Sequence, residues 1–203
     1  MRNLLLPLCL LLIATAACSP QNATESATES ATESAAQSQA ESAFSTGPVI
    51  ADYGPAALID ADFKIPTGTK FKISYDTVKT TEPGEINKTL TTAARFLNMH
   101  AKAGVAEEAM ELAIVFHSKA IFDLTTPARY GETFDGPKNK AENANAGIIK
   151  ALLDKNTRII VCGQSAAFYE IKNEDLLPGV EMALSAMTAH AVLQQEGYTL
   201  NPF

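Results

Sequence analysis

Short apolar runs alternate with helical patterns along residues 48–203, and this alternation constrains the fold more than any other feature of the chain. Phe71, Ile73 and Tyr75 alternate with polar residues, which is typical of a strand. Further strands are expected at 111–117, 157–162 and 180–184, and helices at 86–101, 139–153 and 185–196. Strands that alternate with helices predict an α/β domain with a mainly parallel sheet and helices on both faces.

Two residues with useful chemistry fall at the ends of expected strands. His117 closes the second expected strand, and Cys162 closes the third. Right-handed crossovers place the carboxyl ends of all parallel strands at one edge of the sheet. Ligands of such sheets bind at that edge, near the point where the strand order reverses. We therefore expect the functional site around His117 and Cys162.

The residues that precede this domain resemble a secretory signal peptide, which we assign to 1–18. Arg2 precedes an apolar run, and small residues follow that run. The run is shorter than the roughly 20 residues that a transmembrane helix needs. The sequence 15–18 is similar to the bacterial lipobox, in which the acylated Cys18 becomes the new N-terminus. Ordinary cleavage after Ala16 is the alternative.

The residue after Cys18 bears on the destination of the protein. In a Gram-negative cell, Ser19 is similar to an outer-membrane sorting signal. We expect a lipid anchor on the periplasmic side of the outer membrane, and a soluble periplasmic or secreted protein is the alternative. A chain with several acyl groups on one Cys is held stably at a membrane.

Residues 19–47 have the composition of a disordered tether. Three tandem copies of Ala-Thr-Glu-Ser occupy 23–34, and residues 19–43 contain no Lys, Arg or aromatic residue. Such a segment buries too little apolar surface to offset the entropy of ordering. The tether is either a spacer that holds a domain away from a membrane or a low-complexity expansion without function.

The composition excludes several classes of protein. Lys and Arg number 16 against 23 Asp and Glu, a net charge of -7, so a nucleic-acid surface is not expected. Three cysteines are too few for a disulfide scaffold or a Cys-based zinc site. Neither a G-x-S-x-G elbow nor a dinucleotide or P-loop glycine pattern occurs.

Several stretches of residues 50–203 together resemble the DsrE/DsrF-like family of small α/β sulfur-relay proteins, in particular its secreted or periplasmic branch. They are Tyr53–Pro55, Ala94–His100, Val115–His117, Val161–Gln164, Leu177–Val180, Ala183–Thr188 and Leu193–Tyr198. The resemblance implies a flavodoxin-like fold, homo-oligomers that are trimers or hexamers, and sulfur carried as a persulfide on one Cys. Ser118 stands where the family usually has Gly after the His.

Cys162 is the cysteine expected to remain in the folded domain, because Cys9 and Cys18 lie in the signal peptide. A thiol becomes nucleophilic as a thiolate, which a helix N-terminus favours, and the turn at Gly163 and Gln164 is expected to open a helix. Cys162 is therefore either a persulfide-carrying or redox-active thiolate or a buried, inert residue.

His117 has two interpretations. It can act as a base or ion-pair partner of Cys162, or it can bind a backbone carbonyl as an ordinary strand-end residue. Candidate ligand contacts are Gly163, Gln164, Ser118 and Lys138. Lys138 and the neighbouring Lys140 would receive an anion such as a sulfur oxyanion, unless they simply solvate a helix.

The other expectations concern the remaining histidines and bound groups. We expect His100 to form a cap or an oligomer contact and His190 to lie in a core or an interface. No metal site is predicted, because Cys162 and His117 lack a third ligand, and no cofactor is implied.

Two functions are therefore open. The first is a periplasmic protein that carries or transfers sulfur through Cys162, with a donor and acceptor that are proteins or small sulfur species. The second is a non-catalytic oligomeric module that binds a small ligand or a partner and has a structural Cys162. Whether the protein is an enzyme with turnover is left open.

Overall fold

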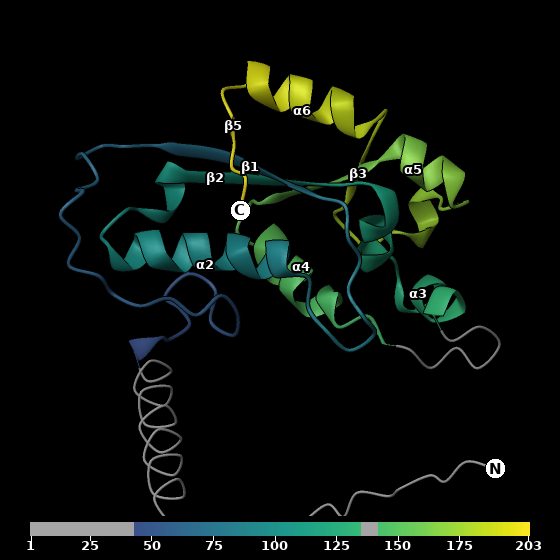
Figure 1. The fold of residues 1–203 in the computed structure, drawn as a ribbon, viewed down its shortest axis with the longest axis horizontal. Coiled ribbons are helices and arrows are strands. Elements are labelled where there is room, and N and C mark those ends of the chain that lie inside the picture. The colour runs from purple at the N-terminus through teal and green to yellow at the C-terminus, as the bar shows by residue number, and fades with distance from the viewer. Residues whose placement is uncertain (1–42, 135–141) are drawn as a thin grey trace, which may run out of the picture. The chain divides into compact units, whose positions relative to one another are not determined.

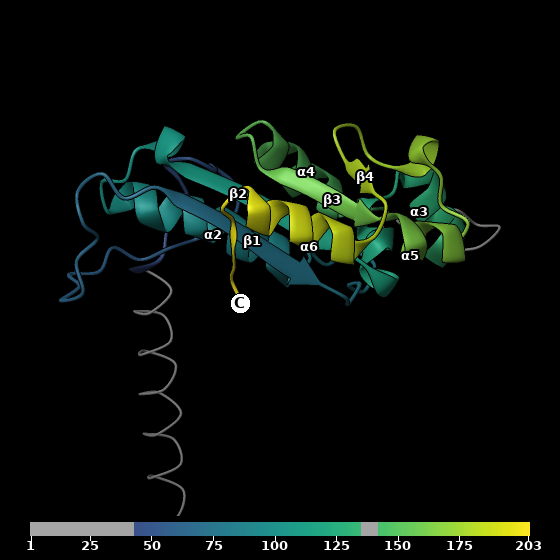
Figure 2. The same cartoon turned by 90° about the horizontal axis from the view of Figure 1, so that it is seen from above.

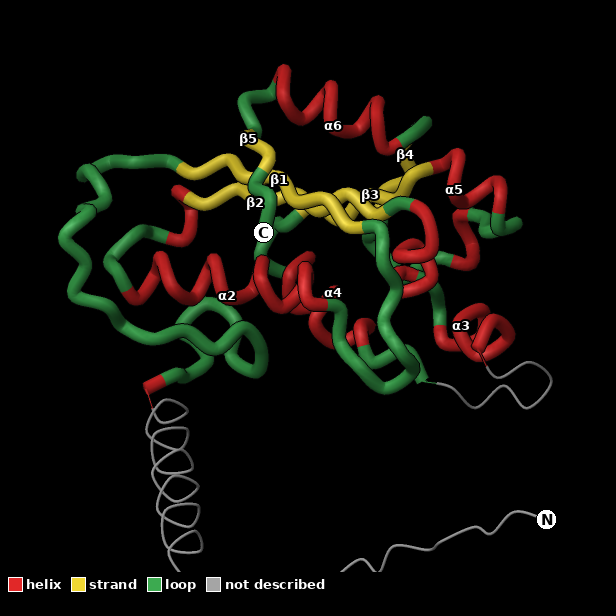
Figure 3. The backbone as a smooth tube through the Cα atoms, viewed as in Figure 1, coloured by secondary structure: helices red, strands yellow, loops and turns green. Residues whose placement is uncertain are grey.

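The computed structural model describes residues 43–134 and 142–203, and residues 43–203 form one compact unit. Five parallel strands form one sheet in the order β4-β3-β2-β1-β5, drawn in yellow in Figure 3. The strands are β1 (Phe71–Thr77), β2 (Met110–Phe116), β3 (Arg158–Cys162), β4 (Glu181–Ala183) and β5 (Thr199–Leu200). The predicted α/β fold with a parallel sheet is confirmed.

Helices cover both faces of the sheet, as predicted. Helices α2 (Lys88–Lys102) and α4 (Asn145–Leu153) lie on one face, and α6 (Ala186–Gln195) lies on the other (Figure 1). Viewed from above, α6 runs across the sheet (Figure 2). The other helical segments are α3 (Pro127–Phe134), α5 (Gly163–Phe168), η1 (Glu107–Ala109), η2 (Ser118–Leu124) and η4 (Asn173–Asp175). None of the described helices is long and apolar enough to span a membrane.

Alternation along the strands divides the side chains between the two faces. Leu112, Ile114 and Phe116 of β2 belong to the large core beneath α2 and α4. Ala113 and Val115 belong to a smaller cluster beneath α6. The strand register extends this division to the neighbouring strands, because paired residues of parallel strands share a face.

The same division places three polar or reactive residues beneath α6. Asp76 of β1 pairs with Val115 of β2. His117 and Cys162 each come one residue after the pair Phe116 and Val161. Asp76, His117 and Cys162 therefore share the α6 face and mark the carboxyl ends of three adjacent strands.

Helix α4 begins later than the sequence predicted. We expected a helix from 139, but α4 begins at Asn145. Residues 135–141 lie outside the described part, and 142–144 are not helical. The cause is Asn143, whose side-chain amide donates to the carbonyls of Asp123 and Thr125 while its oxygen accepts from the Asn145 N–H. These bonds hold the chain against η2 and fix the start of the helix.

The last helix follows the prediction closely. Ser185 is the N-cap of α6, and its hydroxyl accepts a hydrogen bond from the Thr188 N–H. Gly197 follows the helix with φ +90°. A left-handed glycine is a common helix terminator because it lacks the Cβ that makes this conformation costly. The chain then enters β5, a two-residue strand that the sequence did not predict.

Residues 49–54 pack on α2 through one buried amide. The Asn98 oxygen accepts from the N–H groups of Val49 and Ile50, and its nitrogen donates to the carbonyls of Ile50, Tyr53 and Gly54. Gly54 comes so close to α2 that an added Cβ would lie 2.2 Å from the Arg95 nitrogen. Two of the stretches that carry the family resemblance thus meet in space.

Candidate functional site

Cys162 lies at the end of β3, next to β4, and the helices that follow these two strands pack on opposite faces of the sheet. It ends β3 and is the N-cap residue of α5. Ala166 of α5 joins the core beneath α2 and α4, whereas Ala189 of α6, which follows the adjacent β4, joins the cluster on the other face. The strand ends that precede these two helices form a topological switch point, the usual position of a ligand site in open parallel sheets.

Gly163 and Gln164 hold the two turns together around Cys162. A Cβ added to Gly163 would lie 2.5 Å from the Ala183 carbonyl oxygen, so a larger residue would push the turns apart. The Gln164 side-chain amide donates to the Leu184 carbonyl over 3.1 Å. Gly163 and Gln164, which we predicted to contact a ligand, therefore pack against or bind the backbone that follows β4.

The thiol is recessed, with Cys162 only 5% exposed. Burial raises the pKa of the thiol, but the N–H and hydroxyl of Ser165 and the N–H groups of Ala186 and Gln164 outweigh it, so the pKa is lowered overall. Cys162 thus combines a shielded position with a stabilised thiolate.

His117 is held by side chains, so the interpretation as a carbonyl-bound strand-end residue does not describe it. Its Nε2 lies 3.1 Å from Oδ1 and 3.2 Å from Oδ2 of Asp76. Its Nδ1 lies 3.3 Å from the Ser118 hydroxyl oxygen. An ionised carboxylate only accepts hydrogen bonds, so Nε2 carries a proton. Both ring nitrogens have partners other than Cys162, which lies one strand away on the same face.

Asp76 also receives His190, a contact that sequence reasoning missed. The Nε2 of His190 in α6 lies 2.8 Å from Asp76 Oδ1. Of the two positions expected for His190, the core is wrong, because its side chain is 27% exposed and faces this carboxylate, and the interface stays a prediction. Asp76 and His190 are 114 residues apart, so their proximity depends on how α6 crosses the sheet. The sequence offered one indication of this contact, because Asp76 is a charged residue near the carboxyl end of β1.

The remaining predicted residues lie elsewhere. His100 stacks on Phe96 with ring centroids 3.9 Å apart, and its Nδ1 lies 2.8 Å from the Phe96 carbonyl oxygen. Burial lowers the pKa of His100. Lys138 lies outside the described residues. Within 43–134 and 142–203, no group of three His, Cys, Asp or Glu residues has the geometry to hold a metal ion.

Ser118 stands where the resemblance implies Gly, and its backbone conformation is one that favours glycine. Its φ is +53°, in the left-handed region that favours glycine. Its N–H donates to the Ser165 hydroxyl oxygen over 2.9 Å. Ser118 therefore contacts both His117 and the first turn of α5.

A model of the DsrE/DsrF-like family matches residues 72–202. The chain belongs to this family. The matched span includes Asp76, His117, Cys162 and His190. Membership of the DsrE/DsrF-like family suggests a function related to sulfur relay.

The chain was also compared with solved structures and with curated proteins. The chain is similar in structure to a protein of unknown function, MTH1491, from Methanobacterium thermoautotrophicum, with 14% identity and a TM-score of 0.49. That likeness covers 66% of this chain and 100% of the other. A search of curated proteins gave no match.

Proposed function

We propose that this DsrE/DsrF-like protein carries sulfur as a persulfide on Cys162 and passes it to an acceptor. The observation that carries the proposal is the position of a recessed thiol of lowered pKa at the switch point of the sheet. A thiolate at this position is a nucleophile, and the recess shields a lone thiol from disulfide formation with a second chain.

The sulfur transfer needs no external oxidant. The Cys162 thiolate attacks the outer sulfur of a donor persulfide, the donor S–S bond breaks, and the donor leaves as a thiolate. The Cys162 persulfide that forms then gives its outer sulfur to an acceptor thiolate in the same way, which regenerates the Cys162 thiolate. The donor and acceptor are a protein thiol or a small sulfur species.

Mass spectrometry tests the proposal. The full chain is incubated with a persulfide donor, and peptide mapping then follows the tryptic fragment 159–172, which contains Cys162. We expect a gain of about 32 Da, one sulfur atom, on this fragment. The gain should be absent from the Cys162→Ser variant and should disappear when a thiol acceptor is added. A wild-type chain that gains no sulfur at Cys162 would overturn the proposal.

The low exposure of Cys162 favours a second candidate, an oligomeric binding module in which this Cys is structural. In that case Cys162→Ser would leave ligand or partner binding intact, and the wild-type thiol would resist alkylation until the protein unfolds. Alkylation of the folded protein therefore separates the two candidates.

We also propose that the protein is a homo-oligomer, anchored by acylated Cys18 to the outer membrane on its periplasmic side. Light scattering reports the oligomeric state, for which a trimer or hexamer is expected. Radiolabelled fatty acid should enter the wild type and not Cys18→Ser. Incorporation that persists in this variant would contradict the anchor.

A further inference from the structure

An exposed apolar surface lies at the end of the domain where the described chain begins. Residues 57–70 lead into β1 and contain neither helix nor strand. Exposed apolar side chains gather on this segment and on α2, namely Leu58, Ile59, Phe63, Ile65 and Met99. They line a groove of about 380 Å³, which we call the apolar groove. Such a concentration of exposed apolar side chains usually marks an interaction surface.

The chain enters the domain beside this groove. Ser45 and Ala56 exchange two backbone hydrogen bonds, of 3.2 and 3.0 Å. Lys102, the last residue of α2, donates to the Ser45 hydroxyl over 2.8 Å and to the Ala56 carbonyl over 2.7 Å. Ala57, the next residue, lines the groove. The point at which the preceding residues join the domain is therefore fixed next to the apolar groove.

The length of the preceding chain determines which face of the domain stays near an anchor. Residues 19–42 separate Cys18, the proposed site of acylation, from the described chain. The tether predicted from the sequence, taken as a random coil, spans roughly 25–30 Å over these residues. A domain of this size has a radius of gyration of roughly 15 Å. Because the two lengths are similar, the face at the junction is the one held closest to the membrane.

The charge of the segment suits a lipid surface. Residues 57–70 carry two acidic and two basic side chains, so their net charge is zero, whereas the whole chain has a net charge of -7. Asp60 and Lys64 also pair with each other over 3.2 Å. Anionic phospholipids repel acidic surfaces, so this neutral and apolar stretch is the part of the domain that a bilayer accepts most readily.

We propose that the apolar groove docks on the lipid surface to which Cys18 anchors the protein, with Leu58, Ile59 and Phe63 in contact with the bilayer. This inference rests on the proposed anchor. Contact occurs at the level of the headgroups, where the backbone of an irregular segment stays hydrated. The groove is small, but the anchor makes its contact intramolecular, at an effective concentration on the order of millimolar.

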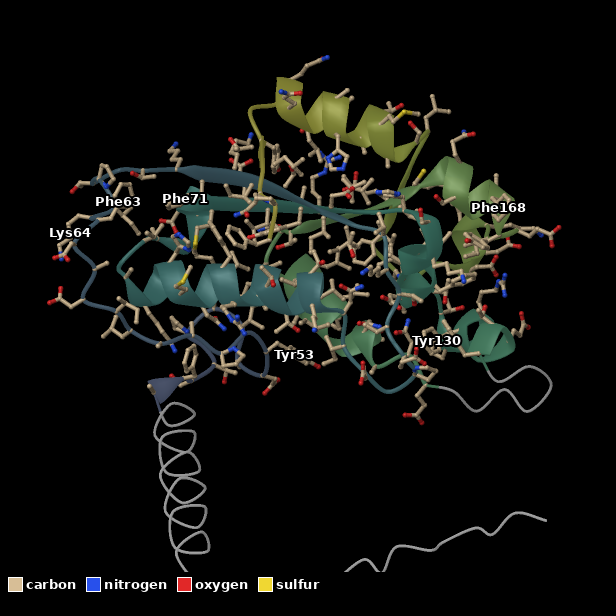
Figure 4. The ribbon with its side chains drawn as sticks, in the orientation of Figure 1. Tyr53, Phe63, Lys64, Phe71, Tyr130 and Phe168 are labelled. Atoms are coloured by element: carbon tan, nitrogen blue, oxygen red, sulfur yellow. The ribbon has the colours of Figure 1, made fainter. Side chains whose placement is uncertain are left out.

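Docking through this end also orients the candidate site. Phe63 and Phe168 lie at opposite ends of the domain (Figure 4). Phe168 is the last residue of α5, and Cys162 is the N-cap residue of the same short helix. Docking at Phe63 therefore turns the end that carries Cys162 away from the lipid, where a soluble sulfur donor or acceptor can reach it.

Tryptophan fluorescence tests the proposal, because the chain contains no Trp of its own. Phe63→Trp and Phe168→Trp are prepared in the acylated protein and reconstituted in phosphatidylcholine vesicles. Phospholipids with brominated acyl chains quench a Trp that enters the bilayer. We expect them to lower the emission of Phe63→Trp about twofold and to leave that of Phe168→Trp unchanged.

Leu58 and Leu184 provide a matched control, because each is 73% exposed. In the Phe63→Trp background, Leu58→Asp should remove most of the quenching, since a charge at this position opposes insertion. Leu184→Asp lies outside the groove and should leave the quenching unchanged. Circular dichroism checks that both variants are folded.

Four outcomes would overturn the proposal. Equal quenching of Phe63→Trp and Phe168→Trp would show that no face is preferred. An acylated protein that floats with the vesicles while Phe63→Trp stays unquenched would overturn the docking and leave the anchor intact. Emission of Phe63→Trp that shifts with protein concentration in the unacylated Cys18→Ser chain, without vesicles, would assign the groove to a second copy. A protein that carries no acyl group and does not float would contradict the anchor and the docking together.

Discussion

The two faces of the sheet are built from the same strands but serve different purposes. Beneath α2 and α4, the side chains form a large, closed apolar core. Beneath α6, the cluster is small, and the strand ends expose Asp76, His117 and the recess of Cys162. The alternation of side chains along each strand therefore separates the apolar core from the candidate site, since neighbouring residues of one strand contribute to opposite faces.

Two matched leucines provide the largest expected effect. Leu112 lies in the large core and Leu193 in the cluster beneath α6, and each is 1% exposed. We expect Leu112→Ala to lower the free energy of unfolding by about 4 kcal/mol and Leu193→Ala by about 2 kcal/mol, because α6 can shift to close its cavity. Chemical denaturation checks both values. Equal losses would remove the distinction between the two faces.

Asn98 tests whether a polar group also matters on the closed face. It is fully buried and makes five hydrogen bonds to residues 49–54. We expect Asn98→Ala to lower the free energy of unfolding by roughly 3 kcal/mol, because several buried backbone groups lose their partner. Proteolysis should then cut residues 49–54 more rapidly. Lys88→Ala, an exposed residue on the same helix, is the control and should have little effect.

Asp76 tests the open face in the same way, with a smaller expected effect. Its side chain is 36% exposed and contacts two histidines. We expect Asp76→Asn to lower the free energy of unfolding by about 0.5–1 kcal/mol, since partly exposed side-chain contacts contribute little and asparagine keeps one acceptor oxygen. Glu111→Gln, which removes the carboxylate facing Lys72, is the matched control. A loss of several kcal/mol would show that this cluster is a structural element.

The smallest expected effect on stability is the pH dependence that comes from Cys162. Its pKa is lowered in the folded protein, so the thiolate stabilises the fold above the pKa of the unfolded thiol, and this contribution is lost as the pH falls through the folded pKa. Wild type should therefore gain stability relative to Cys162→Ser as the pH rises over the interval below about 9, the ordinary pKa of a thiol. Thermal unfolding across this interval checks the sign. A constant or narrowing gap would contradict the lowered pKa.

Much of the fold followed from local patterns in the sequence. The four longer strands and the caps of α6 were predicted because alternation, Ser185 and Gly197 act over a few residues. The predicted start of α4 was wrong, because the Asn143 side chain donates hydrogen bonds to the carbonyls of Asp123 and Thr125, which lie 20 and 18 residues earlier in the chain. Helix α3 and strand β5 were missed, and β5 exists only because α6 returns the chain to β1.

The same contrast between local patterns and long-range contacts applies to the candidate site. The sequence by itself determined the α/β class, the family and the position of Cys162 at a strand end before a helix, because each depends on short-range pattern. Tertiary structure alone decided that His117 turns to Asp76, that His190 joins them, and that the N-termini of α5 and α6 meet at the thiol. Those contacts depend on strand order and on the crossing of α6, which no local pattern encodes.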